Sequence, residues 1–112
     1  MTATTVTLVG ATGKLGAVVG RRLLARGISV LPVVRTPEKL GPELRAPARA
    51  FNVERKETIA AALQGTRLLV SCLHGRYGVD LLRALPPGVE RVVLLGSARI
   101  FTRFPDPNVA LL

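Results

Sequence analysis

The chain has 112 residues, enough for one domain with a modest hydrophobic core and little more. Hydrophobic residues make up 48% of the sequence and aromatic residues 4%, which excludes a disordered chain and predicts a core of Val, Leu and Ala. There is no apolar run long enough to cross a bilayer, no secretory signal, and only one cysteine, Cys72, so an internal disulfide is excluded. We therefore expect a cytoplasmic protein without a membrane partner.

The charge is strongly basic, with 16 Lys and Arg against 7 Asp and Glu and a formal net charge of +9. Such a charge balance is found in proteins that bind nucleic acids or anionic membranes. However, the arginines are scattered along the chain, and Tyr77 and the three phenylalanines do not alternate with them as stacking residues would. A solvated basic surface without specific nucleic-acid binding is the favoured interpretation.

Predicted strands and helices alternate from the N-terminus onward. Apolar runs predict strands at Thr5–Val9, Ile28–Val34, Ala50–Val53, Arg67–Cys72 and Arg91–Leu95. Helices are predicted from the end of the first strand to Arg26, over a short segment after Thr36, and at Lys56–Leu63 and Gly78–Leu85. In the first helix the apolar spacing predicts a buried face made of Leu15, Val18, Val19 and Leu23.

This alternation predicts an α/β fold with right-handed crossovers, namely a Rossmann-type doubly wound parallel sheet covered on both faces. The expected strand order is 3-2-1-4-5, with a ligand crevice at the carboxyl ends of the strands near the first and fourth. Pro32 fits the second strand only if its missing N–H faces a gap or a bulge. We expect residues 1–112 to form a single domain.

The stretch Gly10-Ala11-Thr12-Gly13-Lys14-Leu15-Gly16 lies between the first predicted strand and helix. Gly10 allows a sharp turn off the strand, Gly13 allows a phosphate to approach the backbone, and Gly16 allows the helix to lie close to the sheet. The free N–H groups and positive dipole end of the helix suit a pyrophosphate. In this position the glycine spacing predicts a dinucleotide site, with a ligand-free strand-to-helix turn as the alternative.

A triphosphate-binding P-loop is the main competitor for such a glycine-rich turn. That motif requires a Ser or Thr after the Gly13-Lys14 pair and a further glycine five residues before Gly13. Leu15 and Leu8 occupy those two positions. The sequence therefore excludes a P-loop.

Arg35 stands nineteen positions after Gly16, where an NAD-preferring domain places an acidic residue for the ribose 2′-OH. An arginine there can hold a 2′-phosphate instead, with Lys39 as a second cation. The alternative is that Arg35 is an exposed cation after a strand. Because no Asp or Glu stands at that strand end, we favour NADP(H) over NAD(H).

The exits of the third and fourth strands reach the same rim of the predicted crevice. Asn52 and Val53 can bracket an adenine there, and Ser71, Cys72 and Leu73 precede the only histidine, His74. A loop histidine without a carboxylate or nucleophile partner is more often structural than catalytic. Cys72 is expected to be a small core side chain, and the sequence contains no metal-ligand cluster.

Two segments, Val9 to Gly16 and Val33 to Lys39, resemble the NmrA-like, atypical short-chain dehydrogenase/reductase families. Asn52 to Leu63 is similar to their third strand and following helix, and Val92 to Ser97 to their fifth strand. The resemblance implies roles for Thr12, Lys14 and Leu15 on the pyrophosphate, Arg35 on the 2′-phosphate, Asn52 and Val53 on the adenine, and Ser71, Cys72 and Leu73 in the cleft lining. The families usually have Asp where Asn52 stands.

The Tyr-x-x-x-Lys pair of ordinary short-chain dehydrogenases is absent, because Leu81 stands four residues after Tyr77. The families' substrate-binding half would lie beyond Leu112, so we expect a domain that binds the dinucleotide but lacks its substrate-binding part. Two functions remain open: a domain of an NADPH-dependent oxidoreductase with an unidentified small-molecule acceptor, or a non-catalytic redox sensor of NmrA type. Exposed Phe101 and Phe104 would favour a homo-oligomer.

Overall fold

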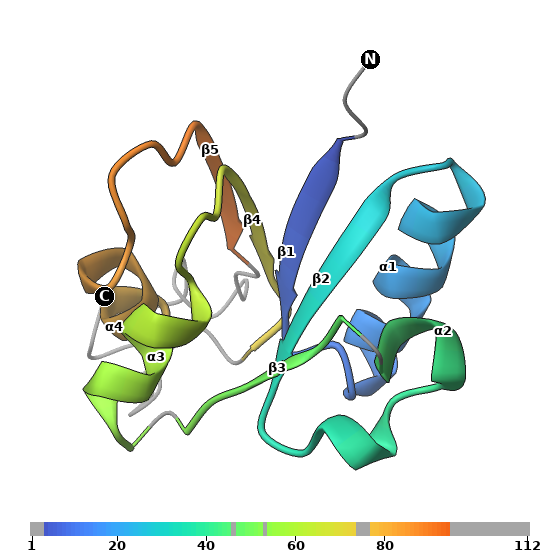
Figure 1. Ribbon diagram of the computed structural model, residues 1–112, viewed down its shortest axis with the longest axis horizontal. Coiled ribbons are helices and arrows are strands. Elements are labelled where there is room, and N and C mark those ends of the chain that lie inside the picture. The colour runs from blue at the N-terminus through green and yellow to red at the C-terminus, as the bar shows by residue number, and fades with distance from the viewer. Residues whose placement is uncertain (1–3, 46, 53, 74–76, 95–112) are drawn as a thin grey trace, which may run out of the picture.

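The structure is a computed structural model that describes residues 4–45, 47–52, 54–73 and 77–94 (Figure 1). The described residues form one five-stranded parallel sheet in the order β3-β2-β1-β4-β5. Its strands are β1 (Thr5–Val9), β2 (Ser29–Val34), β3 (Arg49–Ala50), β4 (Leu68–Ser71) and β5 (Arg91–Leu94). The helical elements are α1 (Lys14–Ala25), the 3₁₀ turn η1 (Pro37–Lys39), α2 (Pro42–Arg45), α3 (Lys56–Ala62) and α4 (Gly78–Arg83). The predicted Rossmann-type fold and strand order are confirmed.

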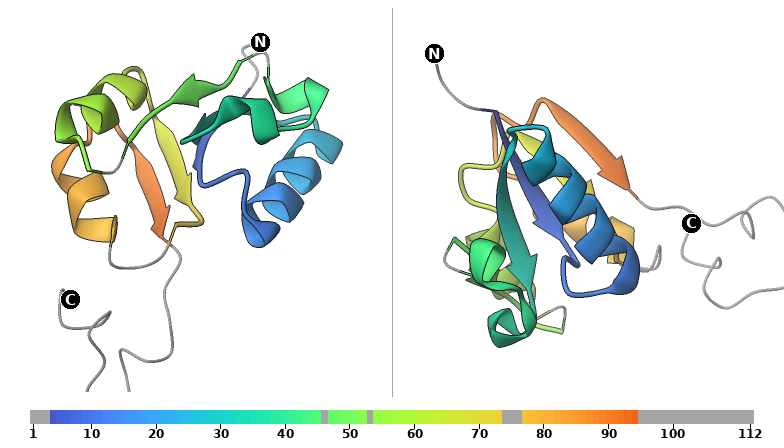
Figure 2. Two further views of the ribbon diagram at one scale, coloured as in Figure 1. Left: turned by 90° about the horizontal axis from the view of Figure 1, so that it is seen from below. Right: turned by 90° about the vertical axis from the view of Figure 1, so that its right-hand side faces the viewer.

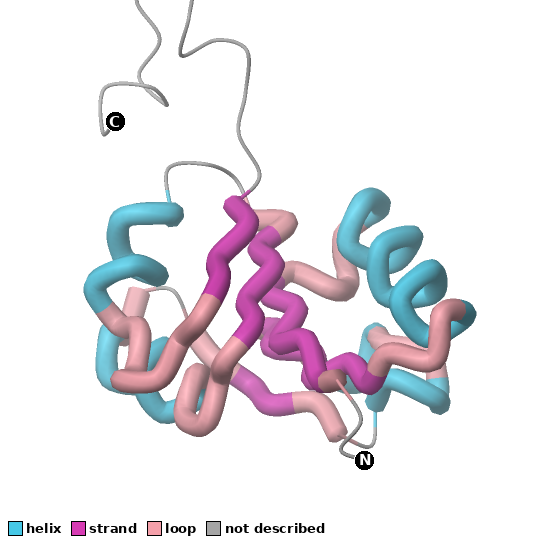
Figure 3. The backbone as a smooth tube through the Cα atoms, turned by 90° about the horizontal axis from the view of Figure 1, so that it is seen from above, coloured by secondary structure: helices cyan, strands magenta, loops and turns pink. Residues whose placement is uncertain are grey.

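Helices cover both faces of the sheet, with α1 and α2 on one side and α3 and α4 on the other (Figures 2 and 3). Because successive strand side chains point to opposite faces, the core divides into two clusters. The first contains Leu8, Val30 and Val34 with Leu40 and Leu44 from the η1–α2 segment. The second contains Val9, Val33 and Leu69 with Phe51, Ile59, Ala62, Leu63 and Leu81. Crossovers on both faces leave the carboxyl ends of the strands free for a site.

Helix α1 approaches the sheet through glycines. Gly16 and Gly20 are its buried residues, and a Cβ on Gly20 would lie 3.2 Å from a Leu44 side-chain carbon. The predicted buried face is therefore wrong in part, because Leu15 and Val18 are 47% and 39% exposed. The close approach of Gly16 and Gly20 to the rest of the domain sets the rotation of α1 about its axis, and this rotation leaves Leu15 and Val18 exposed.

Pro32 lies in an interior strand without interrupting the sheet. Val34 O accepts the Phe51 N–H on the β3 side, and Pro32, two residues earlier, faces the same side. The pairing of β3 begins only at Val33, opposite Arg49, so Pro32 has no partner strand at its nitrogen. The predicted gap is confirmed, and the missing N–H removes no sheet hydrogen bond.

Candidate functional site

The carboxyl ends of β1, β2, β3 and β4 lie side by side at one edge of the sheet. Backbone hydrogen bonds connect them: Gly10 N–H donates to Val33 O (3.1 Å), Phe51 N–H to Val34 O (3.0 Å) and Cys72 N–H to Val9 O (2.9 Å). The segments that follow these strands contain the residues predicted to bind a dinucleotide. The strand register thus brings together residues from Gly10 to Leu73 that are far apart in sequence.

The start of the glycine loop is fixed by its own backbone and by the exit of β4. Gly10 has a φ of +83°, a region that side chains other than glycine rarely adopt. A Cβ at Gly10 would also lie 3.2 Å from the Leu73 nitrogen and from the Cys72 carbonyl carbon. The turn off β1 therefore requires glycine both for its conformation and for its packing against β4.

Gly16, at the other end of the loop, is required by close packing alone. A Cβ placed on it would lie 2.0 Å from Gly10 O and 2.9 Å from the Ala11 Cα. Both are backbone atoms, so no rotation of a side chain can relieve the overlap. Gly16 thus holds the first turn of α1 against the loop that precedes it.

Gly13 differs from both of these glycines. Its φ of −72° and ψ of 169° suit any residue, and a Cβ there would meet only Gly10 O, at 3.6 Å. Gly13 is exposed and stands at the N-terminal cap of α1. The fold would therefore accept a side chain at position 13. A side chain there would fill the space next to the N-terminus of α1, and glycine leaves that space open.

The N-terminus of α1 presents unpaired donors next to that space. The first hydrogen bond of the helix runs from Ala17 N–H to Gly13 O at 2.9 Å, so the N–H groups of Lys14, Leu15 and Gly16 precede it. The first turn contains no acidic residue, and Thr12, Lys14 and Leu15 are exposed. Free N–H groups, the positive dipole end of a 12-residue helix and an absent side chain fit a pyrophosphate.

Arg35 directly follows β2, next to the strand whose end turns into the glycine loop. Its side chain is exposed and makes no hydrogen bond or ion pair with any residue in the described ranges. Lys39 is also exposed and, with Thr12, Arg21 and Glu43, lines a surface pocket of about 110 Å³. The structure therefore places two cations beside the loop, at the side where β2 ends.

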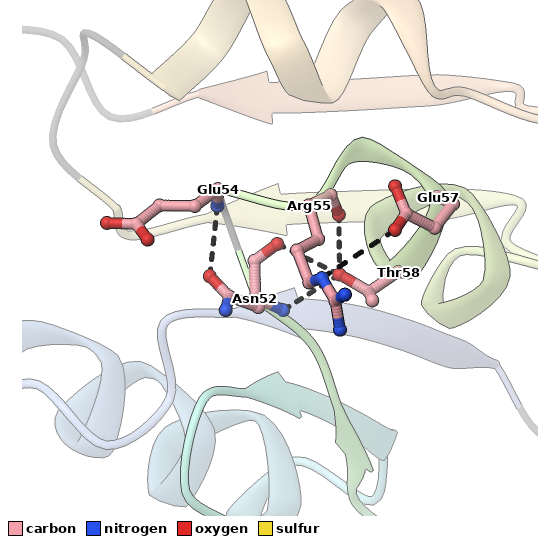
Figure 4. Close-up of polar contacts among 5 residues, drawn as sticks. All are labelled: Asn52, Glu54, Arg55, Glu57 and Thr58. Carbon is pink, nitrogen blue, oxygen red and sulfur yellow. Dashed lines mark hydrogen bonds and ion pairs between the residues drawn. The ribbon is translucent and has the colours of Figure 1, made fainter.

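Asn52 lies two residues beyond the end of β3 and is half-buried. Its backbone N–H donates to Thr58 Oγ1 at 2.9 Å, and its Oδ1 accepts the Glu54 N–H at 3.0 Å (Figure 4). The sequence reasoning did not identify Thr58, although a hydroxyl in the first turn of a helix after a strand exit is a sign of such a contact. Val53, the second predicted adenine contact, lies outside the described residues.

The exit of β4 contributes backbone more than side chains. Ser71 is 4% exposed, and its Oγ accepts the Leu73 N–H at 3.3 Å, so its hydroxyl is used within the turn. Leu73 packs against the core beneath α3 and α4, and Cys72 against the core on the opposite face. Burial raises the pKa of the Cys72 thiol, which favours the neutral form. His74 and Ser97 lie outside the described residues.

One further surface pocket of the described residues lies away from this edge of the sheet. A surface pocket of about 290 Å³ lies between α3 and α4, and none of the predicted site residues lines it. No group of metal-ligating side chains occurs within the described ranges. There is also no helix in this part of the chain with the length and apolarity needed to cross a membrane.

A family model described as NAD(P)H-binding matches residues 10–110. The match starts at the first glycine of the loop and includes every predicted site residue. A search of curated proteins found no match.

Solved structures of longer proteins share the fold. An Agrobacterium tumefaciens short-chain dehydrogenase/reductase superfamily protein with bound NAD is similar with a TM-score of 0.75 and 16% identity, over 96% of this chain and 41% of that one. A Veillonella parvula short-chain dehydrogenase/reductase is similar with a TM-score of 0.74 and 16% identity, over 93% of this chain and 52% of that one. A Staphylococcus aureus nucleoside-diphosphate-sugar epimerase is similar with a TM-score of 0.67 and 25% identity, over 82% of this chain and 37% of that one.

This chain thus spans between 37% and 52% of the length of those three proteins. The first two likenesses, at 16% identity, concern the fold alone. The family match, which extends over most of the chain, is independent of them. The chain belongs to this NAD(P)H-binding family and forms a Rossmann-type domain like those of short-chain dehydrogenase/reductase and epimerase proteins.

Proposed function

We propose that this chain is the NADP(H)-binding domain of a reductase. The observation that carries the proposal is Arg35, an exposed guanidinium beside the glycine loop that is not used by any described residue. A planar guanidinium with several donors matches a phosphate in charge and in geometry. Lys39 lines the surface pocket that also contains Thr12 and Glu43, and adds a second positive charge near the loop.

The lack of an acidic residue directly after β2 supports the same choice of cofactor. An NAD-preferring domain needs a carboxylate at the end of β2 that accepts a hydrogen bond from the ribose 2′-OH. In the described chain that position is Arg35, followed by Thr36, and the next carboxylates are Glu38 in η1 and Glu43 in α2. A cation without an adjacent carboxylate favours the additional phosphate of NADP(H).

The residues of this chain would bind and orient the cofactor. The N–H groups at the start of α1 would hold the pyrophosphate, with Gly13 leaving room for it, and Arg35 would hold the 2′-phosphate. The bound nicotinamide would supply the hydride. Leu81, at the place of the lysine in a Tyr-x-x-x-Lys pair, is 2% exposed and belongs to the core. We therefore assign no acid or base among the described residues.

Calorimetric titration of the purified chain with NADPH and NADH tests the proposal. A charge-assisted contact contributes roughly 1.5–3 kcal/mol, so NADPH should bind about ten- to a hundredfold more tightly than NADH. Equal affinities would overturn the NADP preference. Absence of binding to either cofactor would overturn the dinucleotide function as a whole.

An assay of NADPH oxidation with quinone, flavin and carbonyl acceptors tests the reductase part. Because the chain spans about half or less of the similar structures, we expect tight binding without turnover by the chain alone. Turnover by a protein in which a substrate-binding part is joined to this domain would support the reductase. Binding without turnover in that protein would instead support a redox sensor.

A further inference from the structure

Strand β4 is well covered on only one of its two faces. It lies between β1 and β5 in the interior of the sheet, yet only alternate residues along it are buried. Leu69 and Ser71, on the face toward α3 and α4, are buried, whereas Leu68 and Val70 on the other face are half-buried. A parallel sheet is normally covered on both faces. The described elements therefore leave one side of β4 without a complete covering layer.

The neighbouring edge strand β5 continues this uncovered side. Val70 pairs with Val93 and Leu68 with Arg91, and paired residues of parallel strands point to the same face. Val92 packs against the core beneath α3 and α4, which places Val93 on the other side of the strand. Val93 is 52% exposed. Leu68, Val70 and Val93 thus form an uncovered apolar surface, which we call the open face.

One flank of α1 borders the open face. Helix α1 packs on β1 and β2, and Figure 3 shows no described helix on the α1 side of β4 and β5. Ala17 and Arg21 line the pocket beside η1 and α2, so they mark the flank of α1 that faces β3. With about 3.6 residues per turn, Leu15 and Arg22 lie on the other flank, toward β4. Leu15 is 47% exposed and adds an apolar side chain beside the open face.

The border of the open face is basic. Arg22 on α1 and Arg91 on β5 are exposed on its two sides. The residues of α1, β4 and β5 include no Asp or Glu, and Glu90, directly before β5, is paired with Arg67. Apolar positions between cations favour a partner with apolar side chains flanked by carboxylates. A second copy fits poorly, because a symmetric contact would set the same cations against each other.

We propose that the open face docks an amphipathic helix with acidic flanks that a partner protein supplies. A helix is the element that fits, because helices are what cover the other parts of this parallel sheet. Its apolar stripe would lie on Val70 and Val93, and its carboxylates would reach Arg22 and Arg91. These four residues have no role in the proposed dinucleotide site, so this docking surface goes beyond the proposed function.

Fluorescence anisotropy of labelled synthetic peptides tests the chemistry of the partner. The first peptide is a helix of about 15 residues with leucines at i, i+3, i+4 and i+7 and glutamates on its other faces, and the second has lysines in place of the glutamates. We expect the purified chain to bind the glutamate peptide at least about tenfold more tightly than the lysine peptide. Absence of binding by the glutamate peptide, or equal binding of both, would overturn the proposal.

Two matched pairs of variants locate the docking surface. Val93→Asp should weaken binding of the glutamate peptide by about tenfold, whereas Leu82→Asp, at a residue 48% exposed on α4, should not change it. Arg22→Glu should weaken binding by about fivefold, and Arg21→Glu, the same charge change on the other flank, by about twofold or less. Equal effects within either pair would overturn the assigned site, because binding would then follow net charge or general apolarity.

Sedimentation of the unmodified chain and of Val93→Asp tests a second copy as the occupant. We expect both to have the same oligomeric state, because the open face is assigned to an acidic partner. An assembly of the unmodified chain that Val93→Asp dissociates would assign the open face to a second copy and overturn the proposal.

Discussion

Gly16 and Gly13 serve different purposes in the glycine loop, although the sequence spacing treats the two glycines alike. A Cβ on Gly16 would lie 2.0 Å from the backbone oxygen of Gly10, so the fold itself excludes a side chain there. A Cβ on Gly13, in the middle of the loop, would meet a single atom, at an ordinary 3.6 Å. One glycine is needed to form the domain, and the other is expected to matter only when a ligand is bound.

Because of this difference, substitutions within the seven-residue loop can affect either the stability of the domain or its affinity for a ligand. A substitution at Gly16 acts on a packed backbone contact, whereas a substitution at Gly13 acts on an open space above free N–H groups. The two glycines therefore allow the site to be tested without confusion between unfolding and loss of affinity.

The largest expected effect comes from Gly16→Ala. The added methyl group overlaps backbone atoms that cannot rotate away, so we expect a loss of about 3 kcal/mol or more in the free energy of unfolding. That is a large fraction of the stability of a small domain. Urea unfolding measures it, with Gly13→Ala as the matched control, which should lose less than about 1 kcal/mol. Similar losses in both variants would remove the proposed difference between the two glycines.

Gly13→Val should retain the fold and lose the dinucleotide. Its backbone angles suit valine, while the branched side chain would fill the space next to the N–H groups of Lys14 and Leu15. Loss of charge-assisted hydrogen bonds worth roughly 1.5–3 kcal/mol each should weaken NADPH binding by about a hundredfold or more. Calorimetry on the variant, at a temperature where urea unfolding shows it to be folded, measures this loss of affinity. Unchanged affinity would place the pyrophosphate elsewhere.

The fold was predictable because two sequence signals, apolar runs at the strands and glycines after helices, agreed along most of the chain. Apolar runs identified the strands within one or two residues at most ends, and the glycine punctuation after α1 and α3 marked where those helices end. Gly27 and Gly65, with φ of +76° and +78°, are the positions where such a prediction is strongest.

The orientation of α1 was not predictable from the same signals. Helical spacing grouped Leu15 and Val18 with Val19 and Leu23, because it counts apolar volume and gives glycine no weight. In the structure the face without side chains approaches the sheet, and Leu15 and Val18 remain exposed. Close backbone approach is a property of the assembled layers, and a local pattern does not contain it.

The sequence reasoning on the site was likewise stronger for the backbone than for the side chains. The glycine spacing and the strand ends predicted which segments meet, and the register brings those segments together. The hydrogen bonds of Asn52 with Glu54 and Thr58, and the inward turn of the Ser71 hydroxyl, depend on rotamers that composition and spacing do not determine. The individual ligand contacts stay predictions.

Arg35→Asp extends the comparison from the loop to the neighbouring strand end. Because Arg35 is exposed and forms no hydrogen bond or ion pair with described residues, the unfolding transition should not change. The carboxylate repels a 2′-phosphate and accepts a 2′-OH, so the ratio of NADH to NADPH dissociation constants should fall by about ten- to a hundredfold. Lys39→Ala should lower it less. An unchanged ratio in Arg35→Asp would show that Arg35 is only a surface cation.

The smallest expected effect concerns Cys72, whose backbone packs against Gly10 at the start of the glycine loop. Burial disfavours the thiolate and raises the pKa of the thiol in the folded state. The folded state therefore gains a small stabilisation at pH values below the ordinary thiol pKa, and this is lost as the pH rises above it. The rate of alkylation by iodoacetamide, measured against pH, should have a higher midpoint in the native chain than in the chain unfolded in urea. A midpoint at or below that of the unfolded chain would indicate a thiol that faces the positive end of α1 instead of the core.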